Sequence, residues 1–392
     1  MKAFFSVYPH CFLTANDNSV LIFNPRTKDY VIGRDSEMAL FVRTRTSYVL
    51  QQNDNNLDFL KEAESKGLGY FIHSNSQPPY LAFQEFSFLS SFEKNRKALG
   101  ENPSWKLPSL IKGISIHLNN VDLKKNSSTC IQFDYPEYCE ETHNLATIES
   151  VFPEISNFPA LECIRLCGDI DNTLLYAIKK LDHIESQLVV RTSANNINKV
   201  LRIRNLFPSL KIEIIAADTE DIFKVRQYAL LQNGIQVFYL ISNPKKLKYV
   251  QETLESCCFI PLLYNKREQF DLISQMRLSL DDIMTYNSNM YDCLSKVFFH
   301  KECFGNISFD LKGNVFCQNE RIGNICNSSA INMLGNWLRR ADCLWMLTRN
   351  KFPRCRNCIL AALCPSVSIY ERQGIIPTAC NNDTYEYLQR FV

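Results

Sequence analysis

The chain has 392 residues, of which 46% are hydrophobic and 21% charged, and its formal net charge is +2. This length predicts roughly two or three domains, each with its own core. The near-neutral charge gives no electrostatic case for a nucleic-acid partner, and no apolar run approaches the ~18–20 residues that cross a bilayer. The N-terminal apolar run stops at Tyr8, too early for a signal peptide. We expect a cytoplasmic protein whose 16 cysteines are thiols and metal ligands rather than disulfides.

Residues 1–73 have the pattern of a small α+β domain. Short β-branched runs predict strands at 11–15, 19–23 and 29–33. A helix over 57–66 that ends at Gly67, followed by a returning strand at 68–73, completes the segment. This winged-helix-like layout resembles the leader-peptide-recognition domains of peptide-maturation systems, which bind a precursor by adding its strand to a sheet edge. A generic α+β appendage is the alternative.

Residues 109–290 follow a proline-containing linker at 74–108 and alternate between strand and helix patterns. Six strands are predicted, beginning at residues 113, 161, 187, 211, 234 and 259. The last five starts lie 26, 24, 23 and 25 residues apart, with amphipathic segments between them. Such units predict an α/β fold with a parallel sheet, which we expect to be a partial (β/α)6 TIM-like barrel. An open doubly wound sheet is the alternative, and in either fold the chemistry belongs at the carboxyl ends of the strands.

The last segment, residues 291–392, is a cysteine-rich domain that holds nine of the 16 cysteines. Cys303 and Cys317 enclose a predicted hairpin whose turn contains Gly313. Spacing of the form C-x2-C-x5-C-x15-C then joins Cys355, Cys358, Cys364 and Cys380. Two thiols on one tight loop, followed by two more, indicate one soft-metal centre, either an iron–sulfur cluster or a zinc site. Simple packing is the alternative for any single cysteine.

The β/α region followed by these cysteines resembles the radical SAM enzymes that carry a SPASM extension. The matching positions are Cys303, Gly313, Cys317, Cys355, Cys358, Cys364 and Cys380. The resemblance implies that the last four cysteines hold one auxiliary [4Fe–4S] cluster. A second cluster would use Cys303, Cys317 and a family cysteine that is Ser368 here. Substitutes for that missing ligand are Cys293, Cys326 and Cys343.

The chain departs from this family at the catalytic motif. Active members carry C-x3-C-x2-C after the first barrel strand, where three thiolates leave one iron open for S-adenosylmethionine. The motif occurs nowhere in this sequence, since Cys163 and Cys167 have the first spacing but Ile170 occupies the next position. Where the family places Gly-Gly-Glu against the methionyl amine, the chain has Gly168 and Asp169, a degenerate match to the S-adenosylmethionine site.

We therefore expect a pseudo-radical-SAM protein rather than an enzyme, with one [4Fe–4S] cluster and no bound S-adenosylmethionine. Its expected role is an accessory or scaffold in the maturation of a ribosomally synthesised peptide (a RiPP). The expected partner is the precursor peptide or an active radical SAM enzyme, and neither a nucleic acid nor a membrane. Two alternatives stay open: a divergent active maturase that builds its cluster from Cys130, Cys139 and a remote thiol, and a zinc-stabilised interaction module.

Overall fold

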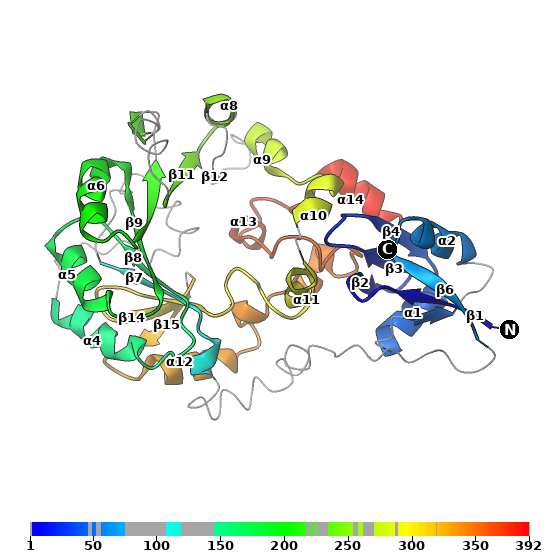
Figure 1. Ribbon diagram of the computed structural model, residues 1–392, viewed down its shortest axis with the longest axis horizontal. Helices are drawn as coiled ribbons and strands as arrows, with labels where there is room; N and C mark the ends of the chain where they lie inside the picture. The colour runs from blue at the N-terminus through cyan, green and yellow to red at the C-terminus, as the bar shows by residue number, and fades with distance from the viewer. Residues whose placement is uncertain are drawn as a thin grey trace. The chain divides into compact units, whose positions relative to one another are not determined.

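The computed structural model describes residues 2–45, 49–51, 56–74, 107–118, 145–216, 220–221, 224–225, 234–253, 258–261, 270–286, 289–318 and 320–391. The chain forms two compact units, whose elements are labelled in Figure 1. We call residues 1–95, 277–301 and 345–392 the terminal unit, and residues 96–276 and 302–344 the sheet unit. The residues predicted as one C-terminal domain, 291–392, are thus divided between the two.

Among the described residues, the sheet unit holds a nine-stranded sheet in the order β12-β11-β10-β9-β8-β7-β13-β14-β15. Its strands are β7 (Gly113–His117), β8 (Cys163–Cys167), β9 (Gln187–Ser193), β10 (Lys211–Ala216), β11 (Ile235–Ile241), β12 (Cys258–Pro261), β13 (Asn306–Phe309), β14 (Asn314–Cys317) and β15 (Glu320–Asn324). Strands β7 to β12 and β13 run parallel, which confirms an α/β fold with a mostly parallel sheet.

The order of strands β7 to β12 rises one strand at a time, without the reversal that defines a doubly wound sheet. Between the described strands, no pairing joins β12 to β15, so the sheet is not closed into a barrel. The predicted hairpin is confirmed: β13 and β14 pair antiparallel, and Gly313 adopts φ 75° in the turn. Its first strand also extends the parallel sheet, because Asn306 pairs with Gly113 of β7.

Helices cover one face of this sheet. The described helices of the sheet unit are α4 (Leu145–Ile155), α5 (Asn172–Leu181), α6 (Ile197–Leu206), α8 (Pro244–Thr253), α9 (Phe270–Met276) and α12 (Ala330–Leu338), with short turns η1 (Pro108–Leu110) and η3 (Ala194–Asn196). In Figure 1, α4, α5 and α6 lie along the same side of the strands. Asp171 caps the N-terminus of α5, because its side chain accepts a hydrogen bond from the amide of Leu174. Because strand residues alternate between faces, Arg165 lies on the opposite side from buried Ile164 and Leu166.

The terminal unit contains two three-stranded antiparallel sheets, β5-β1-β6 and β2-β3-β4. Its strands are β1 (Lys2–Val7), β2 (Phe12–Ala15), β3 (Ser19–Phe23), β4 (Tyr30–Arg34), β5 (Val49–Gln51) and β6 (Gly69–Ser74). Its helices are α1 (Ser36–Arg45), α2 (Leu57–Ser65), α10 (Leu280–Tyr286), α11 (Met290–Phe298), α13 (Ile369–Arg372) and α14 (Asn382–Gln389), with turns η4 (Leu344–Met346, which begins at the unit boundary), η5 (Arg349–Lys351) and η6 (Pro353–Cys355). The predicted strands near 11–33, the helix at 57 and the returning strand are confirmed, whereas β1, α1 and β5 were not predicted.

Strand β3 is buried along its whole length because it contributes to two cores. Val20 and Ile22 pack in a cluster with residues of α1 and α2. Leu21 and Phe23 pack in a second cluster with apolar residues of 359–363 and of α10, α11 and α14. Asn16 adds hydrogen bonds to the carbonyls of Asn357 (2.9 Å) and Phe391 (2.8 Å). The N-terminal sheet and the last cysteine-rich segment therefore fold as one body.

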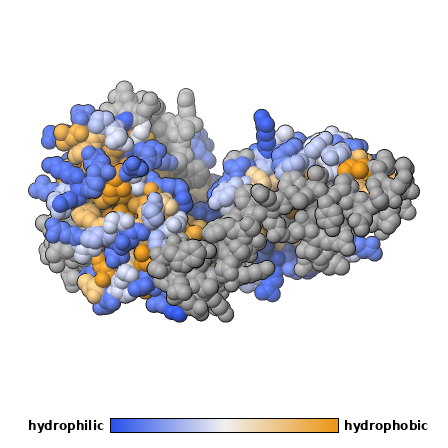
Figure 2. Space-filling model, turned by 60° about the horizontal axis from the view of Figure 1, so that its bottom comes forward, coloured by the Kyte–Doolittle hydropathy of each residue, from blue (hydrophilic) through white to orange (hydrophobic). Residues whose placement is uncertain are grey.

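None of the described helices is long and apolar enough to span a bilayer. On the face shown in Figure 2, apolar residues occur in small groups between polar ones. Single exposed apolar side chains, such as Leu206 and Phe270, are ordinary on protein surfaces.

Candidate metal centre

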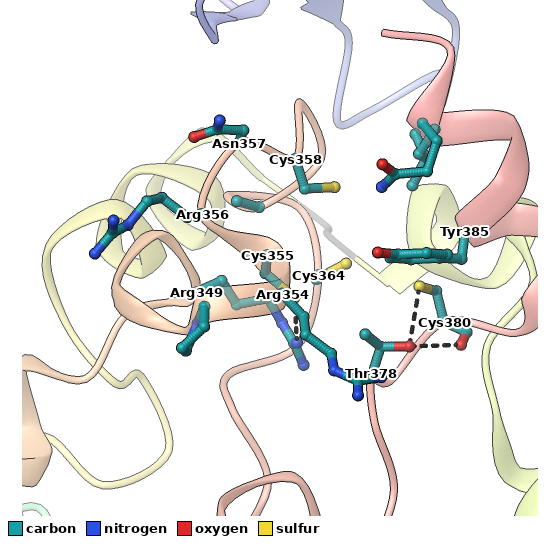
Figure 3. A pocket seen from close by; sticks show the side chains of 14 residues that line it. Arg349, Arg354, Cys355, Arg356, Asn357, Cys358, Cys364, Thr378, Cys380 and Tyr385 are labelled. Carbon is teal, nitrogen blue, oxygen red and sulfur yellow. Dashed lines mark hydrogen bonds between the residues drawn. The ribbon is translucent and has the colours of Figure 1, made fainter. Parts of the chain in front are cut away.

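The four cysteines of the C-x2-C-x5-C-x15-C pattern line one cavity of about 390 Å³ in the terminal unit. Cys355, Cys364 and Cys380 are buried, and Cys358 is partly buried. In Figure 3 the sulfur atoms of Cys358, Cys364 and Cys380 face the same space. The structure thus gathers the four residues that the spacing singled out.

The loop that carries the first three cysteines is a series of tight turns. The amide of Cys358 donates to the carbonyl of Cys355 (3.0 Å), and the amide of Cys364 donates to the carbonyl of Leu360 (3.0 Å). The apolar residues between the cysteines, Leu360 and Leu363 among them, are fully buried in the core shared with β3. Burial of these side chains fixes the loop, while the three cysteines line the cavity.

The fourth cysteine is held by a different part of the chain. Leu278 forms an isolated parallel bridge with Cys380, and its amide donates to the carbonyl of Ala379 at 2.8 Å. The carbonyl of Cys380 accepts hydrogen bonds from Arg277 Nε (2.7 Å) and Thr378 Oγ1 (3.2 Å). The Cys380 thiol in turn donates to Thr378 Oγ1 at 3.6 Å. The cavity itself is lined by residues of three stretches of the terminal unit, 349–364, 378–380 and 385–389.

Burial disfavours the charged form of the cavity thiols. It raises the pKa of Cys358 to about 12 and also raises the pKa of Cys355 and of Cys364, with the positive charge of Arg349 acting in the opposite direction. Metal ligation requires thiolates, so a bound metal centre must supply the positive charge that removes these protons. Arg354 and Arg356 also line the cavity and add positive charge at its edge.

The four thiols are soft donors, which suit either a zinc ion or an iron–sulfur cluster. In the part of the chain that the structure describes, no three His, Cys, Asp or Glu side chains come close enough to share one metal ion. A zinc site holds four sulfurs ~2.3 Å from the same ion. A [4Fe–4S] cluster instead distributes its four thiolates over four irons, so its ligands surround a larger space. The residues that would hold such a cluster are Cys355, Cys358, Cys364 and Cys380.

The hairpin cysteines proposed for a second cluster belong to the sheet unit. Cys303 and Cys317 are both buried, and the sulfur of Cys303 accepts a hydrogen bond from Gln318 Nε2. The substitutes for the missing ligand divide between the units: Cys326 and Cys343 in the sheet unit, and Cys293 in the terminal unit. Burial raises the pKa of Cys293 to about 12, as is typical of a packed thiol. The described residues bring no third ligand to the hairpin pair.

Gly168 and Asp169, the degenerate positions of the S-adenosylmethionine site, lie at the carboxyl end of β8. The amide of Gly168 donates to the carbonyl of Arg191 at 3.0 Å. Asp169 Oδ1 accepts from Asn196 Nδ2 at 2.6 Å and from Ser193 Oγ at 3.5 Å. Asp169 therefore ties the loop after β8 to the end of β9. The loop after β7, with Cys130 and Cys139, lies outside the described residues.

No family model and no curated protein matches this chain. Among solved structures, the crystal structure of Streptococcus suis SuiB is similar to it, with 12% identity, coverage of 97% of this chain and 99% of that chain, and a TM-score of 0.36. Streptococcus suis SuiB bound to S-adenosylmethionine gives 11% identity, the same coverage and a TM-score of 0.38. TM-scores this low carry no argument about what this chain does.

Two residues beside the cavity were not predicted from the sequence: Arg349 and Glu371. Both are 3% exposed, and they form an ion pair with Nη1–Oε1 at 2.8 Å. Part of this arrangement had a local signal, because Ser368 and Glu371 have the spacing of a helix capping box, which the structure contains. Arg349 had no local sequence signal, since its hydrogen-bond partners lie up to 22 residues further along the chain.

The sheet unit contains a second ion group, on the face opposite the helices. Glu213 of β10 accepts from Arg191 Nε of β9 at 2.6 Å and from Arg165 Nε of β8 at 3.0 Å. Burial opposes ionisation of Glu213, but the two guanidinium groups outweigh it and lower the pKa of this carboxyl. A charged residue in the middle of each apolar strand was the sequence signal for this group. We call Arg165, Arg191 and Glu213 the inner-face ion group.

Proposed function

We propose that this protein is an iron–sulfur scaffold of the radical SAM/SPASM type that assists the maturation of a ribosomally synthesised peptide without generating a radical itself. The observation that supports this most strongly is the gathering of four cysteines, at the spacing of the family's auxiliary cluster, around one cavity. Cys355, Cys358, Cys364 and Cys380 would hold one [4Fe–4S] cluster. Such a cluster supplies either a cross-link between chain segments or a site for one-electron transfer.

The non-catalytic part of the proposal comes from the sequence. Reductive cleavage of S-adenosylmethionine needs a cluster whose fourth iron is open, and three closely spaced thiolates create it. No C-x3-C-x2-C motif exists in the chain. An accessory role, in which the protein binds a precursor peptide or an active radical SAM enzyme, is consistent with one cluster and no radical.

The terminal unit offers a place for the precursor peptide. Among the described strands of the two terminal sheets, β6 has six residues and is the longest at an edge. An edge strand presents unpaired backbone groups, to which an extended peptide can add as a further strand. Because the same unit contains the four-cysteine cavity, peptide and cluster would bind to one folded body.

Metal analysis of anaerobically purified protein tests the cluster. We expect about four irons and four sulfides per chain, lost in the Cys358→Ala/Cys364→Ala variant. Cys11→Ala is the control, because this thiol is buried in the other core of the same unit, does not line the cavity, and has its pKa raised to about 12 by burial. This control should keep its iron. Stoichiometric zinc without iron would replace the proposal by a zinc-stabilised interaction module.

The rival function is a divergent radical SAM maturase. Incubation of the reconstituted, reduced protein with S-adenosylmethionine should yield no 5′-deoxyadenosine. Formation of that product, lost on Cys130→Ala or Cys139→Ala substitution, would establish the rival. A content of about eight irons per chain would also favour this rival function, because a second cluster site would then exist.

A further inference from the structure

One buried ion pair connects the chain segments that carry the four cysteines. Arg349 and Glu371 meet in a bidentate arrangement, with Nη1–Oε1 at 2.8 Å and Nη2–Oε2 at 3.0 Å. Parallel N–H···O bonds between a guanidinium and a carboxylate are strong and specify orientation as well as distance. The pair is therefore a rigid junction inside the terminal unit.

The guanidinium of Arg349 uses all five of its N–H donors. Besides Glu371, Nη1 donates to the sulfur of Cys355 at 3.6 Å, Nε to the carbonyl of Pro365 at 2.5 Å and Nη2 to the carbonyl of Ser366 at 3.2 Å. Pro365 and Ser366 directly follow Cys364. One side chain thus contacts the first cysteine and fixes the backbone beside the third.

The carboxylate of Glu371 extends this junction to the fourth cysteine. Its Oε1 accepts a hydrogen bond from the amide of Ala379, the residue before Cys380, at 2.9 Å. Its Oε2 accepts from the amide (2.9 Å) and the hydroxyl (3.0 Å) of Ser368. Ser368 occupies the position of the family cysteine that this chain lacks. Here its side chain caps α13 and holds Glu371 in place.

We propose that Arg349 is the positioning residue of the candidate metal centre, and that its Nη1 bond to Cys355 tunes the cluster held there. This inference rests on the proposed function. A hydrogen bond to a ligating sulfur stabilises the more electron-rich, reduced cluster and raises its reduction potential. Lysine has the same charge but lacks the planar fork of five donors, so it cannot reproduce the junction.

Two variants and one control test the proposal. Arg349→Lys keeps the charge, and Arg349→Met/Glu371→Met removes both charges without leaving one buried alone. Arg372→Lys is the control, because Arg372 is exposed on α13 next to Glu371 and does not line the cavity. Three quantities are measured: iron affinity, reduction potential of the bound cluster, and hydrogen exchange at residues 363–380 in metal-free protein.

We expect both Arg349 variants to bind the cluster about 10–100-fold more weakly, the size seen when partners of metal ligands are removed. The cluster that remains should have a lower potential, and the amides of Ser368 and Ala379 should exchange faster. The control should match wild type in all three. Wild-type affinity, potential and exchange in Arg349→Lys would overturn the proposal. Weaker binding with an unchanged potential would overturn its tuning part, because a purely structural role does not move the potential.

The failure of this inference differs from the failure of the proposed function. Wild-type protein that binds neither iron nor zinc would refute the proposed function. Hydrogen exchange in metal-free protein still decides whether Arg349 positions the cysteines. Faster exchange at Ser368 and Ala379 in the Arg349 variants, with no change in Arg372→Lys, supports positioning, and equal exchange in all proteins overturns it.

Discussion

The two units each contain a buried group of guanidinium and carboxylate side chains, but in different surroundings. In the sheet unit, Arg165, Arg191 and Glu213 lie on three adjacent parallel strands whose backbone hydrogen bonds already fix their positions. In the terminal unit, Arg349 and Glu371 connect turns and short helices around the cysteines. The inner-face ion group is added to strands that backbone hydrogen bonds already hold together. The Arg349–Glu371 pair holds together segments that have no such backbone pairing.

This difference teaches where a buried ion pair matters most. Glu213 has two cationic partners, so it keeps one when the other is removed. Arg349 and Glu371 are each other's charged partner in a bidentate pair. Removal of either side chain therefore leaves the other charge buried without an ionic partner. Removal of one partner of a buried pair is costly for that reason. The predictions below test this contrast.

The largest effect should come from Arg349→Met. We expect the free energy of unfolding of the terminal unit to fall by about 3–5 kcal/mol, because Glu371 stays buried without its partner. Urea unfolding followed by the fluorescence of Trp345 measures it, in a background where Trp105 and Trp337 are phenylalanine. Arg349→Met/Glu371→Met should recover most of the loss. A loss below about 1 kcal/mol, which is what an exposed ion pair contributes, would contradict the difference expected between the two ion groups.

Arg191→Met should cost less. Glu213 retains Arg165, so we expect a loss of about 1.5–3 kcal/mol from the sheet unit, the size of a hydrogen bond to a charged group. A variant that keeps Trp337 of α12 as its only tryptophan reports the unfolding of this unit by its fluorescence. Adding Arg165→Met should cost more than the sum of the single changes, because Glu213 then loses both partners. Simple additivity would contradict the shared role of the two arginines.

Ser368→Ala should have a smaller effect. It removes the cap of α13 and one hydrogen bond to Glu371, so we expect a loss of about 1 kcal/mol in the same Trp345 assay. Ser368→Thr is the matched control, because threonine keeps the hydroxyl that caps the helix. Equal losses in both variants would show that the hydroxyl is not responsible.

The smallest effect is a pH dependence in the sheet unit. The pKa of Glu213 is lowered in the folded state, so the unfolded state takes up the proton first as the pH falls. Wild type should therefore exceed Glu213→Gln in stability at neutral pH. The difference should shrink as the pH falls below the ordinary value of 4.5, because a protonated glutamate resembles glutamine. A difference that grows on acidification would contradict the assignment. Urea unfolding at a series of pH values, followed by Trp337, measures it.

The amino-acid sequence alone determined the features that depend on local pattern. Apolar runs rich in β-branched residues placed strands β7 to β12, and their regular spacing indicated a parallel sheet. The turn at Gly313 identified the hairpin. The spacing of Cys355, Cys358, Cys364 and Cys380 predicted that these residues would meet, because a tight loop can hold two thiols close together whatever the rest of the fold.

Only the tertiary structure decided which surfaces cover one another. An apolar run such as that of β3 shows that a strand is buried, but it cannot tell that α1 and α2 cover one face and residues 359–363 the other. The first strand of the hairpin likewise extended the parallel sheet by pairing with β7, whose residues lie far earlier in the sequence. The partners of Arg349 were equally hidden, because irregular loops place side chains by long-range contacts that leave no periodic trace.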